Sequence, residues 1–141
     1  MSILIINGPN LNLLGKREPE KYGHLSFEEV LKDLRITYDT IEIEYYQSNV
    51  EGELIDRIHK AVEDEHSGII LNAGGYSHTS VALADAVAAI DIPVVSVHIS
   101  NIYQREEERH KELLTKHVVG GIYGLGTRAY KLAVQYLLSD A

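Results

Sequence analysis

The fold is decided by one stretch of the sequence, Gly68-Ile69-Ile70-Leu71-Asn72-Ala73-Gly74-Gly75-Tyr76-Ser77-His78-Thr79-Ser80. Its opening apolar run is too short for a helix, so it predicts a buried strand. Helical spacing begins just after the stretch, at residues 81–87. Two glycines and several polar side chains lie between the strand and this helix. Because ligands of open parallel sheets bind at such strand-to-helix junctions, the stretch is a candidate binding site.

Apolar runs and amphipathic segments alternate along the whole chain. The runs predict five strands, at residues 2–6, 41–46, 68–71, 94–98 and 118–122. Helical stripes predict four connecting helices, at about 27–38, 54–62, 79–89 and 125–137. Such alternation indicates right-handed β-α-β units and a parallel sheet covered on both faces. We therefore expect one α/β domain over residues 1–141, a flavodoxin-like three-layer sandwich with a five-stranded parallel sheet in the order 2-1-3-4-5.

Capping boxes predict where the first two of these helices begin. Ser26 is followed three residues later by Glu29, and Ser48 is followed in the same way by Glu51. In such a box the serine hydroxyl accepts a hydrogen bond from the backbone N–H three residues on. We expect Ser26 and Ser48 to be the N-cap residues.

Composition excludes several classes of function. The chain has 141 residues, a net charge of −8 and no cysteine. The negative charge and the absence of a basic stripe argue against a nucleic-acid partner. The absence of cysteine excludes disulfides and thiolate chemistry, and it is compatible with the cytoplasmic location that we expect. We expect no membrane association and no signal peptide, because no apolar segment is long enough.

Three loops of the predicted topology meet above one edge of the sheet. They carry the polar residues that could contact one small ligand: Asn10, Arg17 and Tyr22; Asn72, His78 and Ser80; His98, Ser100 and Arg109. The histidines lie on different elements, without the spacing of a metal site, and the glycine-rich residues 120–126 lack the lysine of a phosphate-binding loop. We expect no metal, and a small-molecule ligand at this edge.

Each of these residues also has a simpler interpretation. His98 could be a core histidine, Tyr22 a packing residue, and Arg17 a solvated charge. The charged run at 105–111 could be an exposed helical face with ion pairs four residues apart. Asn72 and its glycines could merely shape a turn. The convergence of all of them on one edge favours a binding site over these separate interpretations.

Several motifs resemble one family, the type II 3-dehydroquinate dehydratases. The resemblance rests on Gly8-Pro9-Asn10-Leu11-Asn12-Leu13-Leu14-Gly15, Arg17-Glu18-Pro19, Tyr22-Gly23, Gln47-Ser48-Asn49, residues 51–56 and 72–85, His98-Ile99-Ser100-Asn101, Arg105-Glu106-Glu107, Arg109 and Gly124-Leu125-Gly126. These motifs occur in the expected order over essentially the whole chain, which makes the resemblance specific.

The resemblance implies a flavodoxin-like lyase that dehydrates 3-dehydroquinate to 3-dehydroshikimate in the shikimate or quinate pathway. It implies no metal and no organic cofactor. It also implies a homododecamer built as a tetramer of trimers, in which Asp85 reaches the site of a neighbouring subunit. Independently of the resemblance, the long stretch after the first strand has no periodicity and is interrupted by Gly and Pro, so residues 15–24 are predicted to form a lid with Gly15 and Gly23 as hinges.

Residue roles follow from the same resemblance. Tyr22 would be the base that removes the proton next to the ketone. A phenol ionises near pH 10, so this role needs a neighbouring cation, and Arg17 is the matching residue. Asn10 would hold a water at the enolate oxygen, and His98 would protonate the departing hydroxyl. The remaining residues would bind the substrate: Asn72, His78 and Arg109 its hydroxyls, Ile99 and Ser100 its carboxylate.

One residue departs from the family pattern. The family usually has a glutamate two residues before the histidine of the fourth strand, and this chain has Ser96 there. Ser96 cannot carry a charge, so a low-activity or non-catalytic member is one alternative. A nucleotide- or flavin-binding module on the same fold is another, because fold does not dictate function.

Overall fold

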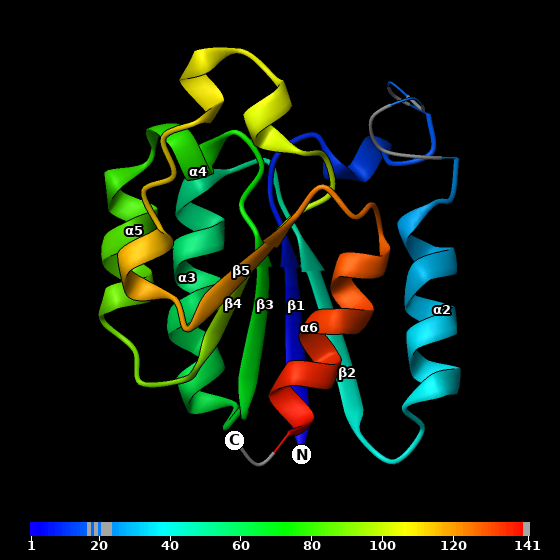
Figure 1. Ribbon diagram of the computed structural model, residues 1–141. Coiled ribbons are helices and arrows are strands. Elements are labelled where there is room, and N and C mark those ends of the chain that lie inside the picture. The colour runs from blue at the N-terminus through cyan, green and yellow to red at the C-terminus, as the bar shows by residue number, and fades with distance from the viewer. Residues whose placement is uncertain (17, 19, 21–23, 140–141) are drawn as a thin grey trace.

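A five-stranded parallel sheet forms the centre of the molecule in the computed structural model, which describes residues 1–16, 18, 20 and 24–139 (Figure 1). Its strands are β1 (Ser2–Asn7), β2 (Glu42–Gln47), β3 (Gly68–Asn72), β4 (Val94–His98) and β5 (Gly120–Tyr123). They pair in the order β2-β1-β3-β4-β5, and all the pairs are parallel. This order confirms the prediction and places the reversal of strand order between β1 and β3.

Helices cover both faces of the sheet. On one face lie α2 (Phe27–Thr37) and α6 (Arg128–Leu138), and on the other lie α3 (Glu51–Glu63) and α5 (Val81–Ala88) (Figure 1). Alternation along β1 explains the two cores, because Ile3 and Ile5 pack under α2 and α6 while Leu4 and Ile6 pack on the opposite side. The three-layer sandwich is therefore confirmed.

Short helical turns complete the described chain and lie in the loops. They are η1 (Leu11–Leu13), α4 (Tyr76–Thr79), η2 (Ile102–Gln104), η3 (Glu107–Arg109) and η4 (Thr115–His117). The charged run at 105–111 could have been one face of an α-helix. It contains instead the short 3-10 turn η3. An ion pair in this run joins Arg109 to Glu106, three residues apart.

One of the two predicted caps is correct. The Ser26 hydroxyl accepts a hydrogen bond from the Glu29 N–H at 3.3 Å, at the start of α2. The prediction that Ser48 caps α3 is wrong, because the N-cap residue is Val50. The Ser48 hydroxyl instead accepts from the Val50 N–H and donates to the Glu53 carboxylate, and these bonds hold it outside the helix.

The last strand and the last helix differ from the prediction. The strand begins at Gly120, two residues later than expected, and the helix begins at Arg128. The helical spacing over residues 125–137 predicts an apolar face made of Leu125, Ala129, Leu132, Ala133, Tyr136 and Leu137. Leu132 and Tyr136 are instead 41% and 48% exposed, and Tyr130 and Val134 are buried in their place. Ala129 and Ala133 fit both stripes, and the hydrogen bonds of Tyr130 described below explain why its face turns inward.

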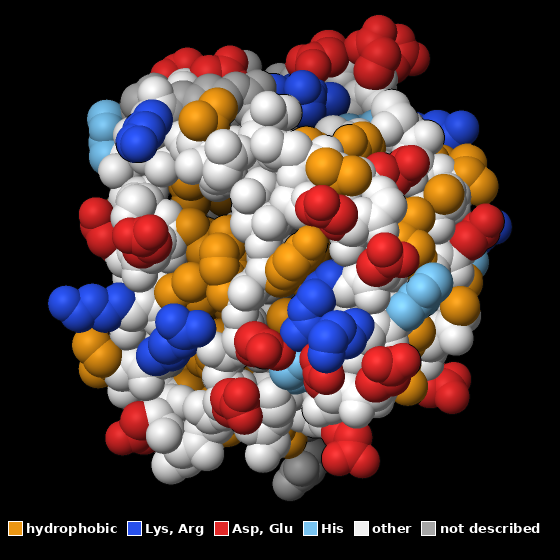
Figure 2. Space-filling view, turned by 180° about the vertical axis from the view of Figure 1, so that it is seen from behind, with side chains coloured by type: hydrophobic (Ala, Val, Ile, Leu, Met, Phe, Trp, Pro, Cys, Tyr) orange, Lys and Arg blue, Asp and Glu red, His pale blue; other side chains and the backbone are white. Residues whose placement is uncertain are grey.

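The surface carries scattered charge. Figure 2 shows Asp and Glu side chains distributed over one face of the molecule, with Lys and Arg between them and apolar side chains in a hollow. Within the described ranges of the chain, no helix combines the length and the apolar character needed to cross a membrane.

Candidate active site

A small pocket lies at the carboxyl ends of β1, β3 and β4, beside the reversal of strand order. We call it the sheet-end pocket; its volume is about 80 Å³, and it shares His78 and Arg109 with an adjoining hollow of about 670 Å³. Its walls come from the three loops that the sequence predicts to converge. The lining residues are Pro9, Asn10, Leu11, Asn72, Gly74, Gly75, His78, His98, Ile99, Ser100, Ile102, Arg105 and Arg109.

Asn72 is held in one orientation at the end of β3. Its side-chain oxygen accepts from the Gly74 N–H at 3.1 Å, and its Nδ2 donates to the Tyr130 hydroxyl at 2.9 Å. That hydroxyl donates in turn to Asn7 Oδ1 at 2.7 Å. Complete burial raises the pKa of Tyr130 far above its ordinary value, so the phenol stays a neutral donor. The chain of bonds ties the ends of β1 and β3 to α6.

Asn10 enters the pocket from a tight turn after β1. Its backbone has φ 69°, and its N–H donates to Asn49 Oδ1 at 2.9 Å. Asn tolerates this left-handed conformation better than most residues. Gly8 lets the turn approach β3, because a Cβ there would lie 2.7 Å from the backbone oxygen of Ala73. The geometry brings the Asn10 side chain to the same rim as Asn72.

Two imidazole rings lie side by side in the pocket. The ring centroids of His78 and His98 are 5.8 Å apart with an interplanar angle of 22°. His78 Nδ1 lies 2.7 Å from the backbone oxygen of Lys111, which can only accept, so this nitrogen carries the hydrogen. His98 is 8% exposed, and among the described residues its Nε2 has no hydrogen-bond partner.

The surroundings of His98 keep its ring neutral. Burial, together with the neighbouring His78 and Arg109, lowers the pKa of this ring from 6.5 to about 4. Desolvation and like charge both disfavour the imidazolium. A ring that is neutral at physiological pH can donate one hydrogen bond and accept another.

Two guanidinium groups make the pocket suitable for an anion. Arg105 Nη1 donates to the Ser100 hydroxyl at 3.3 Å, and Arg109 Nε donates to the Glu106 carboxylate. The Glu106 backbone N–H, followed by Arg109, lowers the pKa of Glu106, so that side chain stays ionised. A small polar anion with several hydroxyls matches this set of donors and acceptors.

The structure brings most of the predicted site residues together. Seven of the predicted residues line the sheet-end pocket: Asn10, Asn72, His78, His98, Ile99, Ser100 and Arg109. Arg17 and Tyr22, with the hinge Gly23, lie outside the described residues. Asp85 is exposed on α5 and does not line this pocket. Ser80 does not line this pocket, and its hydroxyl caps α5 by accepting from the Leu83 N–H at 2.9 Å.

Sequence reasoning missed three residues around the site. Arg105 belongs to the charged run at 105–111, which could be interpreted as an exposed face, but it lines the pocket. Tyr130 lies on the helix face that the predicted stripe left outside. Glu112, which lies 3.5 Å from Ser96, had no motif to mark it. Of these three residues, only Arg105 could have been found from the sequence, because it belongs to the family motif Arg105-Glu106-Glu107.

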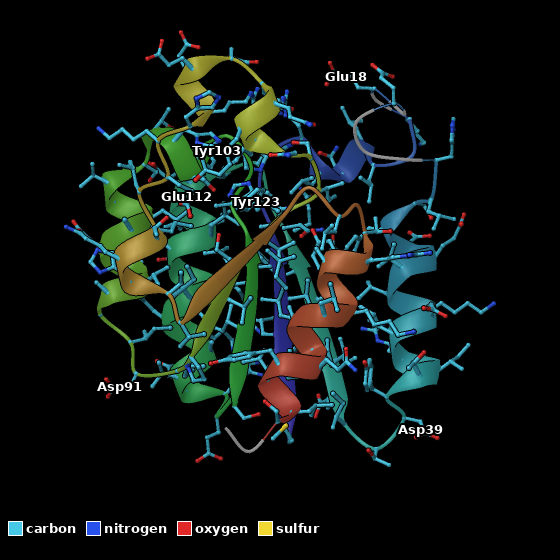
Figure 3. The ribbon with its side chains drawn as sticks, viewed as in Figure 1. Glu18, Asp39, Asp91, Tyr103, Glu112 and Tyr123 are labelled. Atoms are coloured by element: carbon cyan, nitrogen blue, oxygen red, sulfur yellow. The ribbon has the colours of Figure 1, made fainter. Side chains whose placement is uncertain are left out.

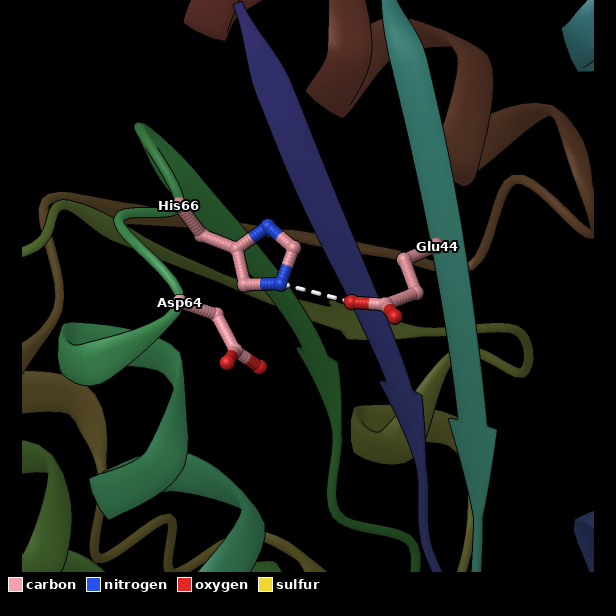
Figure 4. A group of neighbouring side chains, drawn as sticks. All are labelled: Glu44, Asp64 and His66. Carbon is pink, nitrogen blue, oxygen red and sulfur yellow. Dashed lines mark hydrogen bonds and ion pairs between the residues drawn. The ribbon is translucent and has the colours of Figure 1, made fainter.

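Away from the pocket, one group of described side chains has the spacing of a metal site. Ligand atoms of Glu44, Asp64 and His66 lie within 4.8 Å of one another (Figure 4). The Arg57 guanidinium lies 2.7 Å from Glu44 and 3.3 Å from Asp64, and His66 Nε2 lies 2.7 Å from the same Glu44 oxygen. A fixed cation among these ligands makes the group an ion-pair network and an unfavourable metal site.

Comparison with known proteins shows the family of the whole chain. A family model described as Dehydroquinase class II matches residues 1–138. The 3-dehydroquinate dehydratase of Bacillus subtilis (strain 168) is 51% identical over 97% of this chain and 93% of its own length. The catabolic 3-dehydroquinase of Meyerozyma guilliermondii is 46% identical over 97% of each chain.

A solved structure gives the same result for the fold. The type II dehydroquinase from Butyrivibrio crossotus superposes with a TM-score of 0.95 and 42% identity, over 99% of this chain and 98% of the other. The family model, the identities and the coverage of nearly all of each chain agree with one another. The chain belongs to the class II dehydroquinase family.

Proposed function

We infer that the protein is a type II 3-dehydroquinate dehydratase, which converts 3-dehydroquinate to 3-dehydroshikimate with loss of water. The observation that carries this inference is the family match over residues 1–138. The pocket supports it, because its imidazoles, amides and guanidiniums suit an anionic, hydroxyl-rich substrate. A flavin- or nucleotide-binding module is not favoured, since the named relatives are dehydratases over nearly the whole chain.

We propose that Tyr22 removes the proton beside the ketone, with Arg17 stabilising its phenolate. Asn10 then holds a water against the enolate oxygen. His98 gives a proton to the C1 hydroxyl, the C–O bond breaks, and the group departs as water while the C=C bond forms. Because the pKa of His98 is about 4, the free ring is neutral at physiological pH, so as its N–H proton passes to the departing hydroxyl its other nitrogen must take up a proton.

Substrate binding is proposed for the other residues of the pocket. Asn72, His78 and Arg109 hold hydroxyls, and Ile99 and Ser100 hold the carboxylate. The bond from Arg105 to the Ser100 hydroxyl supports the last assignment, because a cation at that position favours an anion.

We propose a homododecamer, arranged as a tetramer of trimers, in the cytoplasm. Asp85 would complete the site of a neighbouring subunit, which is consistent with its exposed position on α5. Exposed leucines between α2 and α6 support self-association: Leu25, Leu125 and Leu132 line one groove and are 49%, 55% and 41% exposed. Contiguous apolar surface of this kind marks interaction sites.

The direct test is to follow the ultraviolet absorbance of the conjugated enone when the purified protein is mixed with 3-dehydroquinate. We expect the absorbance to rise with the natural chain. We expect a rise slower by about 10² to 10⁴ with His98→Gln, the contribution typical of a general acid. No absorbance change with the natural chain would overturn the inferred function.

A further inference from the structure

A second cavity borders His98 and is lined by residues of β4, of β5 and of the segment between them. We call it the rear cavity; its volume is about 190 Å³, and His98 belongs to the lining of both spaces. Figure 3 shows Tyr103, Glu112 and Tyr123, which all line it, beside the upper ends of β4 and β5. Among the described lining residues, Glu112 is the one carboxylate.

Glu112 is fixed toward the strand that carries His98. Its Oε1 accepts from the Leu114 N–H at 2.8 Å, and its Oε2 accepts from the Thr115 hydroxyl at 3.1 Å. The same Oε2 accepts a long hydrogen bond from the buried Ser96 hydroxyl at 3.5 Å. Ser96 and His98 are two residues apart on β4, so their side chains lie on the same face of the sheet.

His98 needs a negative or hydrogen-bonding group on this side. The substrate side already holds His78 and Arg109, which both disfavour a positive ring. Each turnover consumes one proton from the ring, so the ring must regain one before the next. The rear cavity has room for several waters at about 30 Å³ each, and polar groups of Ser96, Thr115 and Glu112 line it.

We propose that Glu112 is a positioning residue for catalysis, which orients His98 and returns its proton from the rear cavity through Ser96 and water. The proposal rests on the proposed function, in which His98 is the acid. The proposal also gives a different interpretation of Ser96, the residue that departs from the family pattern. The carboxylate that position 96 lacks is supplied by a different segment, so an uncharged Ser96 is compatible with full activity.

A purely structural role for Glu112 is the rival explanation. Glu112 accepts from the backbone next to η4, so removing the side chain could simply loosen that turn. Glu112→Gln separates the two roles, because the amide keeps an oxygen for the Leu114 N–H and loses the charge. Glu63→Gln, an exposed glutamate of α3, is the matched control.

The first experiment compares these variants with the natural chain. For Glu112→Gln we expect kcat to fall about ten- to a hundredfold, which is less than the full rate contribution of a general acid. We expect KM and the melting temperature to stay unchanged. NMR titration of the His98 ring should show a lower pKa in this variant and no change in Glu63→Gln. The groups that surround this ring are His78, Arg105 and Arg109 on the pocket side and Tyr103, Glu112 and Tyr123 on the other.

The second experiment moves the carboxylate from position 112 to position 96, the two ends of the Ser96–Glu112 hydrogen bond. Ser96→Glu combined with Glu112→Ser should recover most of the kcat lost in Glu112→Ser alone. Ser96→Glu alone should gain nothing, because two carboxylates in one cavity disfavour each other's ionisation. A natural kcat in Glu112→Gln, or a double variant no faster than Glu112→Ser, would overturn the proposal. If the natural chain turns over no 3-dehydroquinate, the proposed function fails, and the NMR titration still decides whether Glu112 acts on His98.

Discussion

His98 is the residue whose surroundings most strongly alter its chemistry. Its pKa is about 4 in the folded chain and 6.5 when exposed. The unfolded chain therefore takes up this proton first as the pH falls, and the folded state loses stability between pH 6.5 and 4. The difference corresponds to about 3 kcal/mol, since one pKa unit is worth about 1.4 kcal/mol.

We expect His98→Gln to remove this part of the pH dependence. The free energy of unfolding, measured by urea denaturation, should fall less between pH 7 and pH 4 in the variant than in the natural chain, by about 3 kcal/mol. His59→Gln, which changes an exposed histidine of α3, should leave the dependence unaltered. Equal slopes for the natural chain and His98→Gln would show that the buried ring does not resist protonation.

Tyr22→Phe tests the proposed base at the same scale. The variant keeps the ring and loses the ionisable hydroxyl, so we expect turnover to fall by at least about 10²-fold with substrate binding retained. Enone absorbance gives the rate, and isothermal calorimetry gives the affinity. Tyr136→Phe, on the exposed side of α6, is the control and should match the natural chain. Turnover near the natural value in Tyr22→Phe would assign the base to another group.

At the scale of elements, α6 fixes the ends of two strands. The Tyr130 hydroxyl joins Asn7 of β1 to Asn72 of β3, and all three residues are buried. Tyr130→Phe would leave both amides without this partner, which costs about 1–3 kcal/mol for a buried polar group.

We therefore expect Tyr130→Phe to lower the melting temperature and to raise the KM for 3-dehydroquinate. Both effects follow from one cause, because Asn72 loses one of the two bonds that orient it. Thermal unfolding and enone absorbance measure them, and Tyr136→Phe again serves as the control. A variant with a lower melting temperature and natural KM would show that Asn72 does not depend on α6 for its orientation.

At the scale of the whole molecule, assembly is expected to complete the site. Asp85 is exposed in the single chain and lies outside the lining of the sheet-end pocket. If Asp85 acts on a neighbour, Asp85→Ala and His98→Ala chains should each be slow. Refolding them together should restore activity, because some sites then combine a natural His98 with a natural Asp85.

Asp39→Ala, on an exposed turn, should stay active by itself and is the control for the mixing experiment. Sedimentation velocity should give twelve times the chain mass of 15.8 kDa for the natural protein. Mixed chains that stay as slow as the separate variants would place the action of Asp85 within its own subunit, or remove it from the site.

The sequence by itself determined the sheet, its order and the loops that share its edge. The strands and the long helices are encoded largely by neighbouring residues, as in the stretch 68–80, so local periodicity predicts that they exist and in which order, while some of their ends differ. Seven of the eleven predicted site residues line one pocket, because parallel strands bring their carboxyl ends to the same edge of the sheet.

Only the tertiary structure decided which side chains control that pocket. Asn7 and Tyr130 are 123 residues apart in the chain, and Ser96 and Glu112 are 16 apart. No periodicity relates the members of either pair, and the choice of the buried face of α6 depended on the first contact. A hydrogen bond depends on distance in space, so such pairs become visible only when the layers of the fold are packed together.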